Sequence, residues 1–190
     1  MASKLRAAQE DRQQRTELDS KTSETRSAVV GAFFETCFDA FSFLVEEFGF
    51  QRGFKKTDSR AGIYRVWYKS NTTGVEVWLE WREQRIYVEL FRLVDGRIKQ
   101  NPIVIGPKSD LNQFNLEDLL AIREPGLTLR SRAPGEPLTV RSVQLFLTQY
   151  AAALRQRGSD ILRGDFTIFR QLETIVKGRV RTAGIAGICS

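Results

Sequence analysis

Three consecutive segments in the middle of the chain alternate apolar and polar side chains with a period of two. They span residues 63–69, 75–82 and 85–92. Successive side chains of a β-strand point to opposite faces, so this pattern predicts strands whose two faces differ. The links between them are short, Asn71-Thr-Thr-Gly74 and Glu83-Gln84. Short links predict antiparallel neighbours, and Gly74 at the end of the first link is able to take a positive φ. The centre of the fold is therefore predicted to be an antiparallel β-meander.

The two faces of this predicted sheet have different compositions. One face is apolar and is predicted to be core: Tyr64, Val66, Tyr68, Val75, Val77, Leu79, Trp81, Ile86, Val88 and Leu90. The other, which we call the outer face, mixes aromatic side chains with charges of both signs: Arg65, Trp67, Lys69, Glu76, Trp78, Glu80, Arg82, Arg85, Tyr87, Glu89 and Phe91.

Helical periodicity flanks the meander. Apolar residues recur every three or four positions from Val30 to Phe48, and Gly49 follows as a C-terminal cap. Phe50 to Lys56 is predicted to be an irregular edge strand. Asp95-Gly96 predicts a turn that leads to a short strand around residues 103–105.

The second half of the chain is predicted to be mainly helical. Asn115 should cap a helix over residues 116–123, and the proline-rich segment 124–137 should be an exposed loop. A helix over residues 139–157 should end at Gly158, and Asp165 should begin a last helix that ends near Val180.

These elements predict an α+β fold. Four to five antiparallel strands pack against an aromatic amphipathic helix on the N-terminal side and against the C-terminal helices. The chain of 190 residues is 42% hydrophobic, which suits one substantial core. We expect one domain over residues 29–181. Residues 1–28 are expected to be a polar arm, disordered or a solvated helix, and residues 182–190 a flexible tail.

The composition argues against several kinds of catalysis. The chain has no histidine, which is the commonest general base and metal ligand, and only two cysteines, Cys37 and Cys189. Glu76, Glu80 and Glu89 share the outer face, but the basic residues between them favour ion pairs over a catalytic or metal site. We therefore expect no catalytic residues, no metal site, no cofactor and no enzymatic activity.

We expect the protein to be cytoplasmic. The first 28 residues contain six basic and five acidic residues and no apolar core of a signal peptide. The apolar stretch 29–50 is interrupted by Glu35, Asp39, Glu46 and Glu47, so we expect no membrane span. Cys37 lies on the apolar stripe of its helix and is expected to be buried and unreactive.

Three interpretations compete for the outer face. It is a solvated face held together by cross-strand pairs, a protein-binding surface, or a platform on which nucleic-acid bases stack. The three glutamates would repel phosphate, which weakens the last interpretation. For protein binding, the candidate residues are Trp67, Trp78, Tyr87, Phe91 and Arg65.

A second candidate surface is the basic C-terminal region. The net charge of the chain is +6, and residues 151–190 contain seven basic residues against three acidic ones. Such an excess suits contact with the phosphate backbone of a nucleic acid. The residues of this alternative are Arg155, Arg157, Arg163, Arg170, Lys177, Arg179 and Arg181.

Two stretches resemble small uncharacterised bacterial proteins. They are residues 41–50, which contain Phe-Leu-Val-Glu-Glu-Phe-Gly-Phe, and the run from Tyr150-Ala-Ala-Ala-Leu-Arg155 through residues 160–169 to Leu172-Glu173. The resemblance covers about residues 30–180. It implies an immunity or accessory factor in a bacterial defence system and brings no catalytic residues. Together with the outer face, it leads us to expect a non-enzymatic module that binds another protein, with nucleic-acid binding as the alternative.

Overall fold

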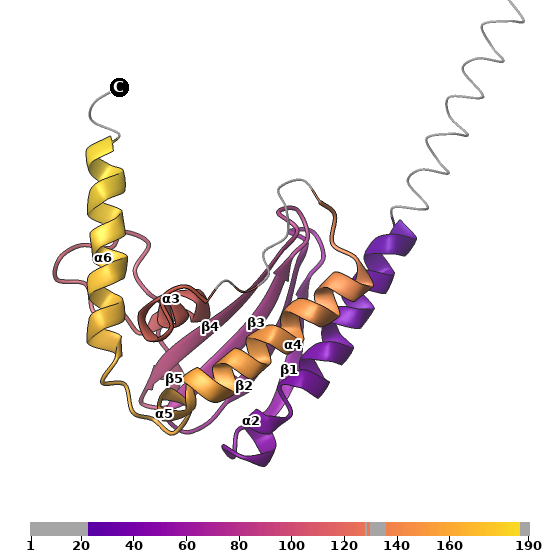
Figure 1. Cartoon of the computed structure of the whole chain (residues 1–190), viewed down its shortest axis with the longest axis horizontal. Helices are drawn as coiled ribbons and strands as arrows, with labels where there is room; N and C mark the ends of the chain where they lie inside the picture. Colours follow the sequence, from indigo (N-terminus) through magenta and orange to yellow (C-terminus); the bar gives the residue numbers. More distant parts are fainter. Residues whose placement is uncertain (1–22, 128, 130–135, 187–190) are drawn as a thin grey trace, which may run out of the picture.

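The computed structural model describes residues 23–127, 129 and 136–186, with side chains up to Arg179. Its centre is an antiparallel sheet in the order β1-β2-β3-β4-β5, with β6 also paired to β4 (Figure 1). The fold is α+β, as predicted. The strands are β1 (Gln51–Asp58), β2 (Ile63–Lys69), β3 (Thr73–Glu80), β4 (Arg85–Val94), β5 (Arg97–Ile98) and β6 (Gln113–Asn115).

Tight turns set the register of the meander. Gln84, between β3 and β4, has a φ of 56°, and Asp95 and Gly96, between β4 and β5, have φ of 51° and 66°. Two successive positive φ values are the signature of a hairpin turn whose twist matches that of its strands. Gly74 departs from expectation, because it lies inside β3, opposite Lys69 and Phe91, and not in a turn.

The helix on the N-terminal side spans residues 23–40 and is followed by a two-residue turn and the short helix α2 (Phe43–Glu46). The sequence predicted one continuous helix here. Gly49 has a φ of 68°, as its predicted capping role requires. The helix begins at residue 23 within the described chain, so residues 23–28 belong to it; the rest of the predicted arm lies outside the described residues.

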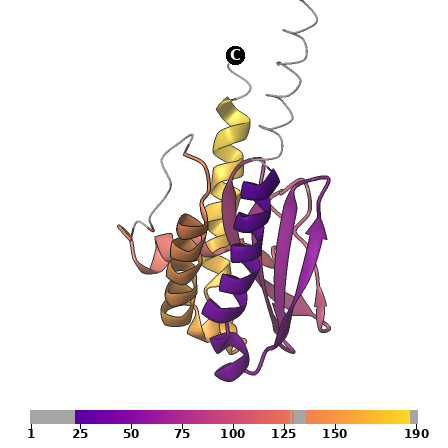
Figure 2. The same cartoon turned by 90° about the vertical axis from the view of Figure 1, so that its right-hand side faces the viewer.

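The apolar stripe of this helix packs on the inner face of the sheet. Val29, Phe33 and Cys37 are buried, and the Tyr68 hydroxyl donates a hydrogen bond of 2.8 Å to the Cys37 carbonyl oxygen. Figure 2 shows this helix beside the sheet, on the same side as α4 (Val140–Arg157). By length and composition alone, Ser23–Glu46 is apolar enough to cross a membrane. In the structure, several of its aromatic side chains, among them Phe33 and Phe41, belong to the hydrophobic core.

Strand β1 forms an irregular edge, as predicted. Its register with β2 shifts between Gln51 and Phe54. Gly53 lies in this irregular part, where a Cβ atom would come within 2.9 Å of the Tyr68 ring, so only glycine fits without displacement. Lys55 is exposed but lies on the helix side of the sheet, opposite Val66, and its Nζ atom lies 4.7 Å from the centre of the Phe34 ring.

The helical half largely follows the prediction. Helix α3 (Leu116–Arg123) is capped by the Asn115 side chain, and α4 begins after Thr139 and ends at Gly158. Helix α5 (Ser159–Leu162) follows directly. Helix α6 (Phe169–Ala186) begins four residues after Asp165 and continues past residue 180, so residues 182–186 are helical. The rest of the predicted tail lies outside the described residues.

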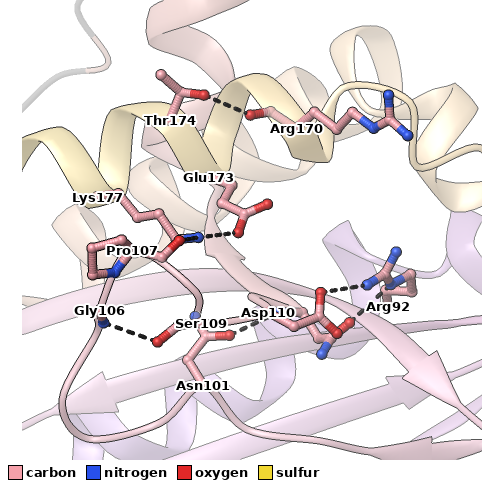
Figure 3. A network of polar contacts seen from close by, with 11 residues as sticks. Arg92, Asn101, Gly106, Pro107, Ser109, Asp110, Arg170, Glu173, Thr174 and Lys177 are labelled. Carbon is pink, nitrogen blue, oxygen red and sulfur yellow. Dashed lines mark hydrogen bonds and ion pairs between the residues drawn. The ribbon is translucent and has the colours of Figure 1, made fainter.

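Polar contacts attach the segment between β5 and β6 to its neighbours (Figure 3). Residues 103–105 do not form the predicted strand; the short strand is β6. The Asn101 amide donates to the Gln113 carbonyl oxygen at 2.7 Å, and the Arg92 guanidinium donates to Asn112 at 2.8 Å. Lys177 of α6 donates to the Pro107 carbonyl oxygen at 2.7 Å.

Candidate functional site on the outer face

The inner face is the core that the alternation predicted. Every residue assigned to it is buried in one hydrophobic cluster except Trp81, which is partly buried against that cluster. The helix over residues 23–40 and α4 lie on this side of the sheet (Figures 1 and 2). The opposite, outer face holds the remaining strand residues, and its chemistry follows from which of them the register brings together.

One row of side chains crosses four strands of the outer face. Lys56 of β1 is opposite Arg65 of β2, Arg65 is opposite Trp78 of β3, and Trp78 is opposite Tyr87 of β4. Directly opposed residues have neighbouring side chains on the same face. We call this set the cationic-aromatic row. Lys56 is exposed, and the other three side chains are partly exposed.

The aromatic end of this row is a stacked pair. The rings of Trp78 and Tyr87 lie 4.2 Å apart between centroids and are inclined by only 18°. The Tyr87 hydroxyl donates to Glu83 in the β3–β4 turn at 3.2 Å, which fixes the orientation of the ring. A rigid, partly exposed Trp–Tyr pair is typical of surfaces that bind other proteins.

Arg65 connects the aromatic pair to a buried carboxyl. Its guanidinium lies over the Trp78 ring, 5.6 Å from the ring centre, and donates a hydrogen bond of 3.1 Å to Glu76. The side chain of Arg65 is 29% exposed, whereas that of Glu76 is only 3% exposed. The arginine therefore covers the carboxyl and keeps one side of its own charge facing solvent.

Glu76 and Glu89 are opposite each other on β3 and β4. Burial raises the pKa of Glu76 to about 7, against the attraction of Arg65 and with a contribution from the nearby Glu89. Burial also raises the pKa of Glu89, which is half-buried and accepts a hydrogen bond of 2.7 Å from the Gln113 amide. Like charges this close cannot both ionise easily, so the pair holds a proton well above the usual range of glutamate.

The indole N–H of Trp78 belongs to the same environment. It is buried and makes no hydrogen bond of regular geometry, yet it lies close enough to Glu89 to lower the pKa of that carboxyl against the larger effect of burial. One member of the stacked pair, Trp78, therefore interacts with Glu89. The sequence predicted ion pairs for these glutamates. Glu76 forms one with Arg65. The sequence did not predict that Glu76 and Glu89 would be buried enough to raise their pKa values.

Trp67 and Phe91 lie on the outer face but are not exposed. They form a second hydrophobic cluster with Leu93, and Phe91 is fully buried. Their ring centroids are 5.1 Å apart. Gly74 of β3 lies between them with no side chain, and a Cβ there would come within 3.4 Å of Phe91. Of the five residues predicted to contact a partner, only Arg65, Trp78 and Tyr87 have surface available for it.

The cations of the basic C-terminal region are mostly paired within the chain. Arg155 forms an ion pair with Glu47, Arg157 with Glu124, Lys177 with Glu173 and Arg179 with Asp118. Arg163 lies over the Phe48 ring at 5.1 Å. Arg170 is exposed, and the side chain of Arg181 lies outside the described part. The positive charge of this region is therefore largely neutralised by neighbouring acidic groups.

Comparisons with known proteins add no relative. No family model matches the chain, and no curated protein and no solved structure matches it. The resemblance to bacterial defence proteins therefore stays a prediction. Among the described residues, no three His, Cys, Asp or Glu side chains come together in an arrangement that could hold a metal ion.

Proposed function

We propose that this protein acts by binding another protein through the outer face of its sheet. The observation that carries the proposal is the partly exposed Trp78–Tyr87 stack with Arg65 lying over it. Trp, Tyr and Arg are the residue types that contribute most to protein–protein binding energy. Here the three are adjacent and held in place by the sheet, so little conformational entropy is lost when a partner docks.

The buried cluster of Trp67, Phe91 and Leu93 on the same face supports this surface. Trp67 and Phe91 pack against each other and contribute to the rigidity of the strands that carry the stack. The role suggested by the sequence resemblance, an immunity or accessory factor in a bacterial defence system, is consistent with binding of this kind and rests on that resemblance alone. We assign no catalytic step to the protein.

Binding of nucleic acid by the C-terminal helices is the weaker alternative. Four of its seven cations already form ion pairs with carboxylates of the same chain. Each of these pairs would have to break before its cation could neutralise a phosphate. Exposed pairs of this kind are weak, but the carboxylates beside these cations lower the net positive charge that a phosphate backbone would meet.

The test is affinity capture from the native cell with the full chain as bait, with and without nuclease. Three baits are compared: the wild type, Trp78→Ala, and the matched control Ile103→Ala, which removes a fully exposed apolar side chain that belongs to no strand. We expect a stoichiometric protein that survives nuclease, binds the wild type and Ile103→Ala, and is lost with Trp78→Ala. A partner that Trp78→Ala retains in full, or proteins that nuclease releases, would refute the proposal.

A further inference from the structure

The two cations of the cationic-aromatic row face each other directly. Lys56 is opposite Arg65 on the neighbouring strand. Like charges in this position destabilise a sheet unless an anion lies between them. Among the described residues Lys56 forms no salt bridge, and its side chain is exposed. Within the described residues, one of these two charges is therefore left without a carboxylate.

The carboxylate that Arg65 does have is a costly one. Glu76 is almost completely buried, and an ionised carboxylate there loses most of its hydration. Arg65 offsets this loss with a single hydrogen bond. A carboxylate that approached from solvent would meet Lys56 and Arg65 together and would remain hydrated on its outer side. Such a ligand would compete favourably with Glu76 for the guanidinium.

Resting on the protein-binding function proposed above, we propose that the partner presents an acidic segment, that its carboxylate takes Arg65 from Glu76, and that Glu76 takes up one proton in exchange. The proton comes from solvent, no covalent bond of the chain changes, and the neutral Glu76 donates its O–H to Glu89. Arg65 thus exchanges the carboxylate of Glu76 for a carboxylate of the partner and remains paired with one negative charge.

The groups around Glu76 are consistent with this exchange. Arg65 on β2 and Lys56 on β1 lower its pKa, while burial and Glu89 on β4 raise it. On β6, the Gln113 amide donates to Glu89 and so helps that carboxyl to remain the charged member of the pair. Once Arg65 turns to the partner, the largest effect that favours ionised Glu76 is gone, so its proton affinity increases in the complex.

Proton uptake gives the binding a distinctive pH dependence. When a complex takes up one proton, its association constant increases by up to tenfold for each unit by which the pH falls. In the free protein, the pKa of Glu76 is about 7. The increase should therefore appear between about pH 8 and pH 7 and level off below, where Glu76 is already protonated before the partner binds.

The test uses defined probes with the full chain at low salt. The probes are rhodamine-labelled decapeptides of glutamate and of lysine and a labelled decathymidine, and fluorescence anisotropy is measured at pH 6 and pH 8. The proteins are the wild type, Lys56→Glu, Glu76→Gln and Arg170→Glu. Arg170→Glu reverses an exposed cation in α6 and is the matched charge control. Lys56→Glu places opposite charges across β1 and β2, so it should not unfold the sheet.

We expect the glutamate peptide to bind wild type about tenfold more tightly at pH 6 than at pH 8. Lys56→Glu should weaken this binding at least tenfold, whereas Arg170→Glu should leave it within about twofold. Glu76→Gln should bind at both pH values as tightly as wild type does at pH 6, because its amide mimics the protonated acid.

The inference is overturned if the glutamate peptide does not bind, if Lys56→Glu binds as well as wild type, or if Glu76→Gln keeps the full pH dependence. Preference for decathymidine or for the lysine peptide over the glutamate peptide would overturn it as well. Its failure is distinguishable from that of the proposed function. A captured partner that requires Trp78 but ignores Lys56→Glu refutes only the acidic segment, whereas capture that does not depend on Trp78 refutes the binding surface itself.

Discussion

The hydroxyl of Thr73 donates a hydrogen bond of 2.9 Å to the carbonyl oxygen of Ile161, 88 residues further along the chain. Both residues are fully buried. The bond joins the start of β3 to α5, and through α5 to the end of α4. It therefore fastens the helical half of the chain to the meander through a fully buried polar contact.

Replacement of Thr73 by valine tests this link. Valine has the same shape, so packing is retained while the hydroxyl donor is lost. The Ile161 carbonyl keeps its second hydrogen bond, from the backbone of Gly164. We expect the free energy of unfolding to decrease by about 1 kcal/mol. Urea unfolding measures it, and Thr73→Ser, which keeps the hydroxyl, is the control. A Thr73→Val protein as stable as wild type would contradict the role of the bond.

Phe91 and Trp78 should respond differently to truncation although they occupy the same face. Phe91 is fully buried beside Trp67, so Phe91→Ala leaves a cavity and should cost about 3–5 kcal/mol. Trp78 is partly exposed, so Trp78→Ala should cost less than Phe91→Ala: the stacking on Tyr87, about 0.5–1.5 kcal/mol, and the burial of the covered part of the ring. Chemical denaturation of both variants gives the comparison. Equal losses would mean that the stack is core and has no surface to offer a partner.

The thiol of Cys37 should be inert in the folded protein. The side chain is fully buried, and burial raises the pKa of the thiol well above its usual range. In a Cys189→Ser background, a thiol-specific disulfide reagent at pH 8 should therefore modify Cys37 only as fast as the protein opens. The rate should increase with urea in parallel with unfolding. Fast modification in buffer alone would show that the helix does not stay on the sheet.

Stability should decrease as the pH rises through the range in which Glu76 ionises. The pKa of this carboxyl is about 7 in the fold, against 4.5 for an unperturbed glutamate. Between these values the folded state binds more protons than the unfolded state, so the free energy of unfolding falls by at most about 1.4 kcal/mol per pH unit. Above about pH 7 this contribution becomes constant. Urea unfolding of wild type and of Glu76→Gln from pH 4.5 to pH 8.5 measures it.

Glu76→Gln should remove most of that pH dependence. Asp160 acts in the opposite direction and at lower pH, because hydrogen bonds from Arg123 hold its pKa below the usual range. Its contribution is lost only at a pH below that range, so Asp160 adds almost no pH dependence between pH 4.5 and pH 8.5. If the free energy of unfolding of the wild type is constant or increases between pH 4.5 and pH 7, Glu76 does not hold its proton in the folded state and the prediction is wrong.

The sheet was predictable because the residues of each strand alone show the alternation that identifies it. Alternation within each strand identified the inner face, and single residues such as Asn115 and Gly158 identified helix ends. The break at residues 41–42 was not predictable, since the apolar periodicity continues across it. The last helix was predicted too short because its small residues carry little pattern.

The candidate site was predictable only in part. Alternation placed Trp67, Trp78, Tyr87 and Phe91 on one face, but exposure on that face depends on neighbours in other strands. Phe91 is buried because Gly74, on the adjacent strand, leaves room for Trp67 to reach it. The burial of Glu76 likewise depends on Arg65, eleven residues earlier in the chain. The burial of Phe91 and that of Glu76 both depend on how neighbouring strands are aligned. The sequence of one strand does not reveal that alignment.

The position of Lys55 on the helix side of the edge strand has a consequence for how the protein behaves at high concentration. An edge strand offers unpaired backbone groups to which a strand of another molecule can add. At β1, such an addition would have to accommodate an ammonium group already engaged with Phe34 and Phe38, next to a backbone irregularity at Gly53. Charged side chains and bulges of this kind are how natural sheets resist edge-to-edge aggregation. A chain with an exposed aromatic surface on its sheet thus keeps the neighbouring edge unsuited to self-assembly.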